Sequence, residues 1–289
     1  MTLLAVPNVS EGRDAAAVDA IGGAFAAGGA RLLDTHVDPD HDRSVFTLAG
    51  EPGTLAAALT AGAREIVARV HVPRPDGAHP HVGALDVAPV VHLDDANRGA
   101  ACAEALVAGD LLGRELGLPV FLYGLLAGGR TRSELRRGGL AELARRMRDE
   151  GLAPDFGPPQ PHAGAGAVLV AARPPLVAFN LELAPPASLD DARRIAERIR
   201  EGGPEGLRGV RAIGLWLERR GVAQVSLNVE DHRATPLAAV AAAARAHAPV
   251  AAAELVGLAP AAAFDGFPTD IPLPGFDSSR HLIENALKS

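Results

Sequence analysis

Apolar residues along the chain recur with two different spacings, which predicts a mixed α and β protein. Apolar positions three and four residues apart are typical of helices, and short apolar runs rich in β-branched residues are typical of strands. Helices are expected over residues 14–27, 52–70, 97–117, 139–150, 188–201 and 236–247. Strands are expected over residues 2–9, 31–37, 43–49, 82–93, 119–125, 167–172, 176–183, 211–217, 222–229 and 249–258.

The order of these elements divides the chain at Pro174-Pro175. After these prolines the order is β-α-β-β-α-β, which is the split motif of ferredoxin-like folds, and the first half has a similar order with insertions. We expect subdomains over residues 1–174 and 175–265, followed by a C-terminal tail over 266–289. Each subdomain is expected to be an α/β sandwich with helices on one face of a largely antiparallel sheet, so the fold class is α+β.

Charge and residue usage exclude several classes of function. The 28 Lys and Arg against 35 Asp and Glu give a net charge of −7, which argues against a nucleic-acid or anionic-membrane partner. Cys102 is the single cysteine, so disulfide frameworks and cysteine metal sites are excluded. The single lysine, Lys288, lies at the end of the chain, which argues against Schiff-base catalysis. The polar start of the chain predicts no secretory leader, and we expect a cytoplasmic protein that acts on small molecules.

Histidines supply the first candidate chemistry. His79 and His81 flank Pro80, which fixes the backbone between them, and Asp86 follows on the expected strand. A neutral imidazole is a natural proton acceptor, and Asp86 could orient it. A solvated loop and a metal site are alternative interpretations of the same spacing.

Three further segments allow more than one interpretation. The connector with His36, Asp38, Asp40, His41 and Asp42 fits either a metal site or an acidic surface loop, and Arg43 after it could bind a carboxylate. Residues 7–13, where a strand turns into a helix, fit an anion site that includes Arg13 or a helix cap by Ser10. The Pro- and Gly-rich residues 161–166 could contact a flat ligand, but their composition favours a linker.

Eight motifs occur in order along roughly residues 3–265. They are 6–13 (VPNVSEGR), 38–46 (DPDHDRSVF), 79–86 (HPHVGALD), 118–124 (LPVFLYG), 154–158 (PDFGP), 166–180 (GAVLVAARPPLVAFN), 223–228 (AQVSLN) and 254–260 (ELVGLAP). Taken together, these motifs resemble the glutamate formimidoyltransferase family, the formiminotransferase domain that is otherwise fused to a cyclodeaminase. The resemblance is specific because the motifs occur in family order.

The resemblance implies a fold, a reaction and a set of site residues. It implies two ferredoxin-like subdomains with a ligand groove between them, a homodimer, and no cyclodeaminase after residue 289. The implied reaction transfers a formimidoyl group between N-formimidoyl-L-glutamate and tetrahydrofolate in histidine breakdown, with His79 as general acid–base and no metal. The implied substrate- and folate-binding residues are Asn8, Glu11, Arg13, Asp38, Arg43, Asp86, Arg136, Ala163, Gly164, Ala165, Gly166 and Ala167.

The chain also departs from the family pattern near the implied site. His81 stands where the family has an arginine, and His36 replaces an acidic residue. Gly139-Leu140 replaces Glu-Tyr, and Ala171 replaces a glycine. These differences bear on the substrate more than on the fold. Two rival functions are a metal-assisted C–N hydrolase that uses His36, Asp38, His79 and His81, and a folate-binding protein without catalytic activity.

Overall fold

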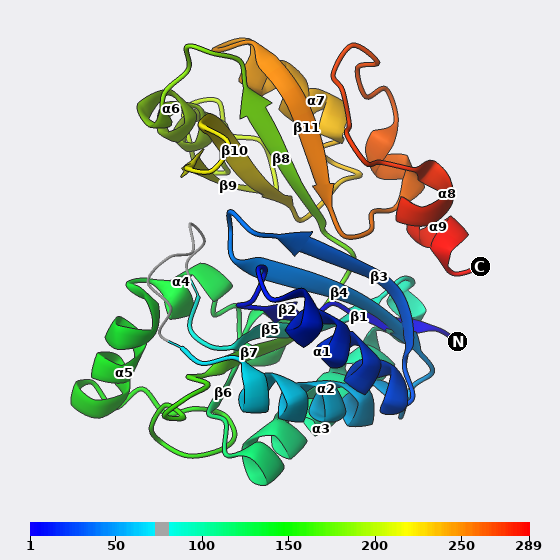
Figure 1. Ribbon diagram of the computed structural model, residues 1–289, viewed down its shortest axis with the longest axis vertical. Coiled ribbons are helices and arrows are strands. Elements are labelled where there is room, and N and C mark those ends of the chain that lie inside the picture. The colour runs from blue at the N-terminus through cyan, green and yellow to red at the C-terminus, as the bar shows by residue number, and fades with distance from the viewer. Residues whose placement is uncertain (73–80) are drawn as a thin grey trace. The chain divides into compact units, whose positions relative to one another are not determined.

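The computed structural model describes residues 1–72 and 81–289 (Figure 1). The chain divides at Pro174-Pro175 into unit 1, Met1–Pro174, and unit 2, Pro175–Ser289. The two prolines lack backbone N–H donors, so they cannot continue the strand that ends at Arg173.

Unit 1 is built on one sheet, which has seven strands within its described residues. The strands are β1 (Leu3–Ala5), β2 (Asn8–Val9), β3 (Arg31–Asp38), β4 (Arg43–Gly50), β5 (Leu85–His92), β6 (Val120–Leu122) and β7 (Val168–Arg173). β1 and β2 both lie between β4 and β5, so they are two parts of the strand expected over residues 2–9. Pro7 separates them because it cannot donate to the ladder, although its carbonyl accepts from Phe46 N (3.0 Å).

Helices cover both faces of the unit 1 sheet. On one face lie α1 (Ala15–Ala27), α2 (Leu55–Arg69) and α3 (Arg98–Leu116), side by side (Figure 1). On the other face α4 (Arg132–Arg136) and α5 (Gly139–Asp149) cover β5, β6 and β7.

β7 shows why the expectation of helices on one face is wrong for unit 1. Val168 and Val170 point into the core beneath α1–α3, whereas Leu169 and Ala171 pack with Leu143 of α5. β5, β6 and β7 are mutually parallel, and parallel strands are generally buried on both faces.

Unit 2 has the expected ferredoxin-like topology. Its elements are β8 (Val177–Leu183), α6 (Leu189–Ile199), β9 (Val210–Leu217), β10 (Val222–Val229), α7 (Leu237–Arg245) and β11 (Val250–Val256). The sheet order β11-β8-β10-β9 is antiparallel throughout, and α6 and α7 share its core.

The chain after β11 completes the core of unit 2. Phe267 packs edge-on against Phe179 of β8, with ring centroids 5.6 Å apart. Two short helices follow, α8 (Ser278–His281) and α9 (Ile283–Ala286), and Ile283 is buried. Within the described part of the chain, no helix is both long enough and apolar enough to cross a membrane.

Candidate active site

Asn8, Arg43 and Asp86 meet where β2 lies between β4 and β5. Asn8 pairs with Val45 on one side and with Val87 on the other. Its side-chain oxygen accepts from Arg43 Nε (3.1 Å) and Nη2 (2.7 Å), while its amide nitrogen donates to Val6 O (2.9 Å). The Asn8 amide is therefore bonded at both ends and fixes the direction of the Arg43 guanidinium.

Asp86 enters this cluster through an irregularity in the ladder between β2 and β5. Asn8 pairs with Val87 and Val9 pairs with Leu85, so Asp86 is an extra residue without a partner on β2. Such a bulge changes the direction of a side chain, and bulges are common beside active sites. In this position the side chain of Asp86 is completely buried.

The Asp86 carboxylate links two arginines that lie far apart in the sequence. Its Oδ2 accepts from Arg43 Nη1 (3.1 Å) and from Arg136 Nη2, and its Oδ1 accepts from Val82 N (2.9 Å). Arg136 is the last residue of α4, so this contact joins α4 to the sheet. Within the described residues, Nε of Arg136 is buried and has no hydrogen-bond partner.

The charges in this cluster shift one another's pKa values. Burial by itself would raise the pKa of Asp86, but the attraction of Arg136 and Arg43 outweighs it and holds this pKa below its ordinary value of 3.8. Burial lowers the pKa of Arg136 to about 9, against the attraction of Asp86, and it also lowers the pKa of Arg43. At neutral pH Arg136 is therefore cationic and Asp86 is anionic, so the two groups form a buried ion pair.

A second group of candidates shapes the connection between β2 and α1 and the turn between β3 and β4. The Glu11 carboxylate accepts from Arg13 N (2.8 Å) and Asp14 N (2.9 Å), and the Asp38 carboxylate accepts from Asp40 N (2.7 Å) and His41 N (2.9 Å). Both acids are buried and bind backbone amides of their own segments. The side chain of Arg13 is 39% exposed and donates from Nε to Pro39 O (3.1 Å).

Gly12 brings these two segments into direct contact. A Cβ atom at this position would lie 2.3 Å from Asp38 O and 2.5 Å from Arg43 N, which is closer than any real contact. Glycine therefore allows the backbone of residues 11–13 to pack on the β3–β4 turn, where Gly12 N donates to Asp42 Oδ1 (3.0 Å). The segment that begins with Asn8 and the segment that ends with Arg43 are thus held together.

The Pro- and Gly-rich segment before β7 belongs to unit 1, so its interpretation as a linker is wrong. His162 Nδ1 accepts from Gly164 N (3.2 Å) and Ala165 N (3.0 Å), and His162 N and Gly166 N each donate to the other residue's carbonyl (2.9 Å). Gly166 has a φ of +72°, a left-handed conformation that glycine adopts without strain. These bonds give residues 163–167, the expected folate-binding loop, a defined shape.

Backbone hydrogen bonds connect this loop to Val72 and to Val82, which lie before and after residues 73–80 in the sequence. Val72 N donates to Gly164 O (2.8 Å) before those residues, and Ala167 N donates to Val82 O (2.9 Å) after them. Ala84 N also donates to Ala165 O (2.9 Å), two residues before Asp86. The loop therefore lies against the start of the segment that carries Asp86.

His79 lies outside the described residues, so its role stays a prediction. His81 is described, and it makes the smallest of the electrostatic contributions that lower the pKa of Asp86, after Arg136, Arg43 and the Val82 amide. Among the described residues, no group of three or more His, Cys, Asp or Glu side chains could hold a metal ion. The metal ligands considered from the sequence are His36, Asp38, His79 and His81. Of these, His79 lies outside the described residues.

Sequence reasoning missed α4 and two side chains near the cluster. Thr131 and Glu134 form a capping box that starts α4, a signal that is visible in the sequence as Thr-x-x-Glu. The Tyr123 hydroxyl is buried without a partner in the described part of the chain, and its electrostatic influence reaches Arg43. Arg146 of α5 donates three hydrogen bonds to carbonyls at the end of α4.

Known proteins are similar to this chain over nearly its whole length. Residues 2–173 match the N-terminal subdomain of the formiminotransferase domain, and residues 178–265 match the formiminotransferase domain. The chain is 34% identical to a glutamate formimidoyltransferase from Streptococcus pyogenes, over 98% of this chain and 97% of that protein.

Two further relatives support the same assignment. A glutamate formimidoyltransferase from Thermoplasma acidophilum is 33% identical over 96% of this chain and 94% of its own. The formimidoyltransferase-cyclodeaminase of Sus scrofa is 37% identical over 88% of this chain but 49% of its own, so the chain spans about half of that longer protein. The chain belongs to the formiminotransferase domain family.

Proposed function

We propose that the protein is a glutamate formimidoyltransferase that acts in histidine breakdown. In this reaction a formimidoyl group moves between the nitrogen of glutamate and an amine of tetrahydrofolate, the co-substrate. The observation that carries the proposal is the similarity to relatives of that name along nearly their whole length. Arg43 and Asp86 come from two separate motifs of the family resemblance, and the cluster that they form with Arg136 supports it.

His79 is proposed as the general acid–base residue. It accepts the proton of the attacking amine as the new C–N bond forms, and it returns a proton to the glutamate nitrogen as the old C–N bond breaks. One imidazole with a pKa near neutrality serves both steps and contributes roughly 10² to 10⁴ in rate.

Arg136 is proposed to bind a substrate carboxylate. Both substrates carry carboxylates, and a guanidinium binds a carboxylate through two parallel N–H donors. Arg136 fits this role because its Nε is buried without a partner in the described part of the chain while Nη2 is held by Asp86. Asn8 and Arg43 then act mainly by fixing Asp86, and Glu11 and Asp38 by shaping the neighbouring turn.

The loop over residues 163–167 is proposed to contact tetrahydrofolate. Its residues are alanines and glycines, so the backbone can approach a flat ring closely. We further propose that the enzyme acts in the cytoplasm as a homodimer on these small molecules. Light scattering after gel filtration measures the oligomer, for which twice the monomer mass of 29.6 kDa is expected.

The direct test mixes purified protein with N-formimidoyl-L-glutamate and tetrahydrofolate, followed by acidification and absorbance detection of 5,10-methenyl-tetrahydrofolate. We expect turnover by the wild type and a roughly 10²- to 10⁴-fold lower rate for His79→Ala. His247→Ala is the matched control, because His247 lies on the surface of unit 2 and pairs with Glu205. Absence of turnover in the wild type contradicts the proposed reaction, and full activity of His79→Ala contradicts the role of this histidine.

A further inference from the structure

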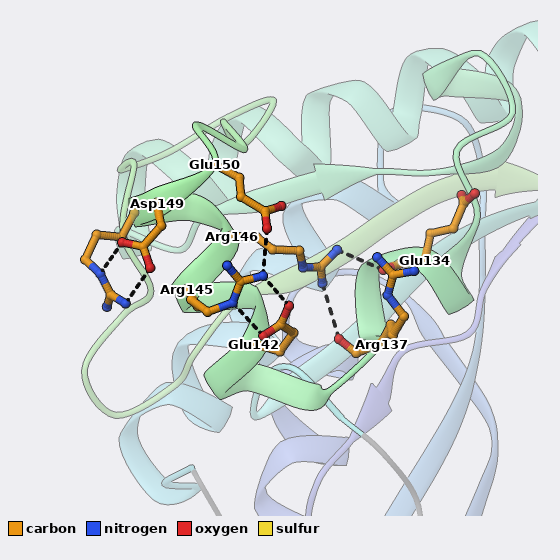
Figure 2. Close-up of polar contacts among 8 residues, drawn as sticks. Glu134, Arg137, Glu142, Arg145, Arg146, Asp149 and Glu150 are labelled. Atoms are coloured by element: carbon orange, nitrogen blue, oxygen red, sulfur yellow. Dashed lines mark hydrogen bonds and ion pairs between the residues drawn. The ribbon is translucent and has the colours of Figure 1, made fainter.

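Arg146 lies on α5, but its hydrogen bonds go to the end of α4. Nη1 donates to Glu134 O (2.9 Å), and Nη2 donates to Leu135 O (2.6 Å) and Arg137 O (3.5 Å). Figure 2 shows the Arg146 guanidinium pointing toward Glu134 and Arg137. The last carbonyls of a helix have no partners within the helix, so Arg146 supplies the donors that α4 lacks.

Arg146 differs from its neighbours on α5 in both burial and partners. Arg145 pairs with Glu142 and Glu150 (Figure 2), and the more exposed Arg148 pairs with Asp149. Arg146 is only 8% exposed, and its guanidinium donates to backbone carbonyls in place of carboxylates. A cation buried at the carbonyl end of a helix is a specific arrangement, because burial of a charge is costly without such partners.

The carbonyls bound by Arg146 surround Arg136. Leu135 and Arg137 are its neighbours in the chain, and the side chain between them reaches Asp86 on β5. α4 has only five residues, so it has little stability of its own and depends on contacts made by its ends. Its first turn is held by the Thr131–Glu134 capping box, and its last turn is held by Arg146.

We propose that Arg146 is a positioning residue, which clamps the end of α4 and thereby directs the Arg136 guanidinium toward Asp86 and the substrate carboxylate. The proposal rests on the proposed function, because the role of Arg136 in substrate binding does. Arg146 is not expected to contact substrate. Its loss should therefore weaken substrate binding through Arg136 while the reacting groups stay in place.

The test compares kinetics of Arg136→Lys, Arg146→Met, Arg146→Lys and the double variant Arg136→Lys/Arg146→Met with those of the wild type. Arg136→Lys identifies which of the two substrates has its KM raised by a change at Arg136. We expect Arg146→Met to raise the same KM roughly tenfold, the size of one lost hydrogen bond to a charged group, with kcat changed much less. The double variant should have the KM of Arg136→Lys alone, because both changes act through one guanidinium.

Arg148→Met is the matched control, since it removes an exposed arginine from the same helix and should leave both KM values unchanged. Additive effects in the double variant, or a rise in the KM of the other substrate, overturn the proposal. Should Arg146→Met fail to fold, Arg146→Lys replaces it, because lysine keeps the charge but lacks the fork that spans several carbonyls.

Hydrogen exchange separates failure of this proposal from failure of the proposed function. If the wild type shows no formimidoyl transfer, the proposed function is wrong, but the clamp can still be measured on the folded protein. Backbone amides of residues 132–137 should exchange faster in Arg146→Met than in Arg148→Met. Equal exchange in the two variants overturns the clamp whatever the activity of the enzyme.

Discussion

Asp86 carries its charge at a position without exposure to solvent, and the two arginines around it keep it ionised. The resemblance in sequence predicted Asp86, Arg43 and Arg136 as separate site residues. It did not predict that one carboxylate binds both guanidinium groups, because this contact depends on the bulge at Asp86 and on α4. Motifs therefore indicated the residue types of the site, whereas the long-range pairing of strands decided which of them meet.

Replacement of Asp86 by asparagine should destabilise unit 1 strongly. The variant keeps the shape of the side chain but leaves Arg43 and Arg136 buried without their carboxylate, a change expected to cost about 3–5 kcal/mol in free energy of unfolding. Urea unfolding of Asp86→Asn against the wild type measures this loss. Asp149→Asn is the control, because Asp149 is exposed and pairs with Arg148 on the surface. A similar effect for the two variants would show that the buried cluster contributes little.

The lowered pKa of Asp86 also predicts a pH dependence of stability. The folded pKa lies below the ordinary value of 3.8, so the charged carboxylate stabilises the fold fully above that value. This contribution is lost as the pH falls through the folded pKa, where the folded carboxylate takes up a proton. We expect the free energy of unfolding of the wild type to exceed that of Asp86→Asn by a constant amount between about pH 5 and about pH 7. Below about pH 4 the difference should be smaller. A difference that grows toward acid would contradict the sign of this shift.

Elements with a clear apolar period were predictable, and elements held by polar contacts were not. α6 and β10 lie within one or two residues of their expected bounds, because one face of each element is buried. α4 has few apolar residues and is stabilised by its cap and by Arg146, which the apolar period does not reveal. The loop before β7 resembled a linker in composition because the bonds that order it are mostly between backbone atoms.

His162 should influence folate binding through the shape of this loop. Its Nδ1 accepts from Gly164 N and Ala165 N, so His162→Ala leaves two loop amides without their acceptor. We expect the KM for tetrahydrofolate to rise several-fold, on the order of the 0.5–1.5 kcal/mol of a typical hydrogen bond, with a smaller change in kcat. His162→Asn, which retains a short acceptor, should lie between this variant and the wild type. An unchanged KM for tetrahydrofolate in both variants would argue against a role of this loop in folate binding.

At the scale of the whole molecule, the order of elements predicted unit 2 better than unit 1. The β-α-β-β-α-β order determines an antiparallel ferredoxin-like sheet when neighbouring strands pair as hairpins and crossovers. In unit 1 the parallel pairing of β5, β7 and β6 joins segments separated by long insertions, and their apolar runs do not show which face a helix covers. The ligand groove between the subdomains, implied by the resemblance, stays a prediction.

Each unit has its own apolar core, and the single tryptophan allows the core of unit 2 to be observed selectively. Trp216 lies on β9 and packs against this core, so its fluorescence should follow the unfolding of unit 2. Phe179 is completely buried beneath Phe264 and Phe267, and Phe179→Ala should lower the free energy of unfolding by about 3–5 kcal/mol through loss of burial and creation of a cavity. Phe276→Ala, at a half-buried ring that contacts Phe264, should cost clearly less. Equal losses in free energy of unfolding for the two variants would contradict this prediction. They would mean that the half-buried ring of Phe276 stabilises unit 2 as much as the fully buried ring of Phe179.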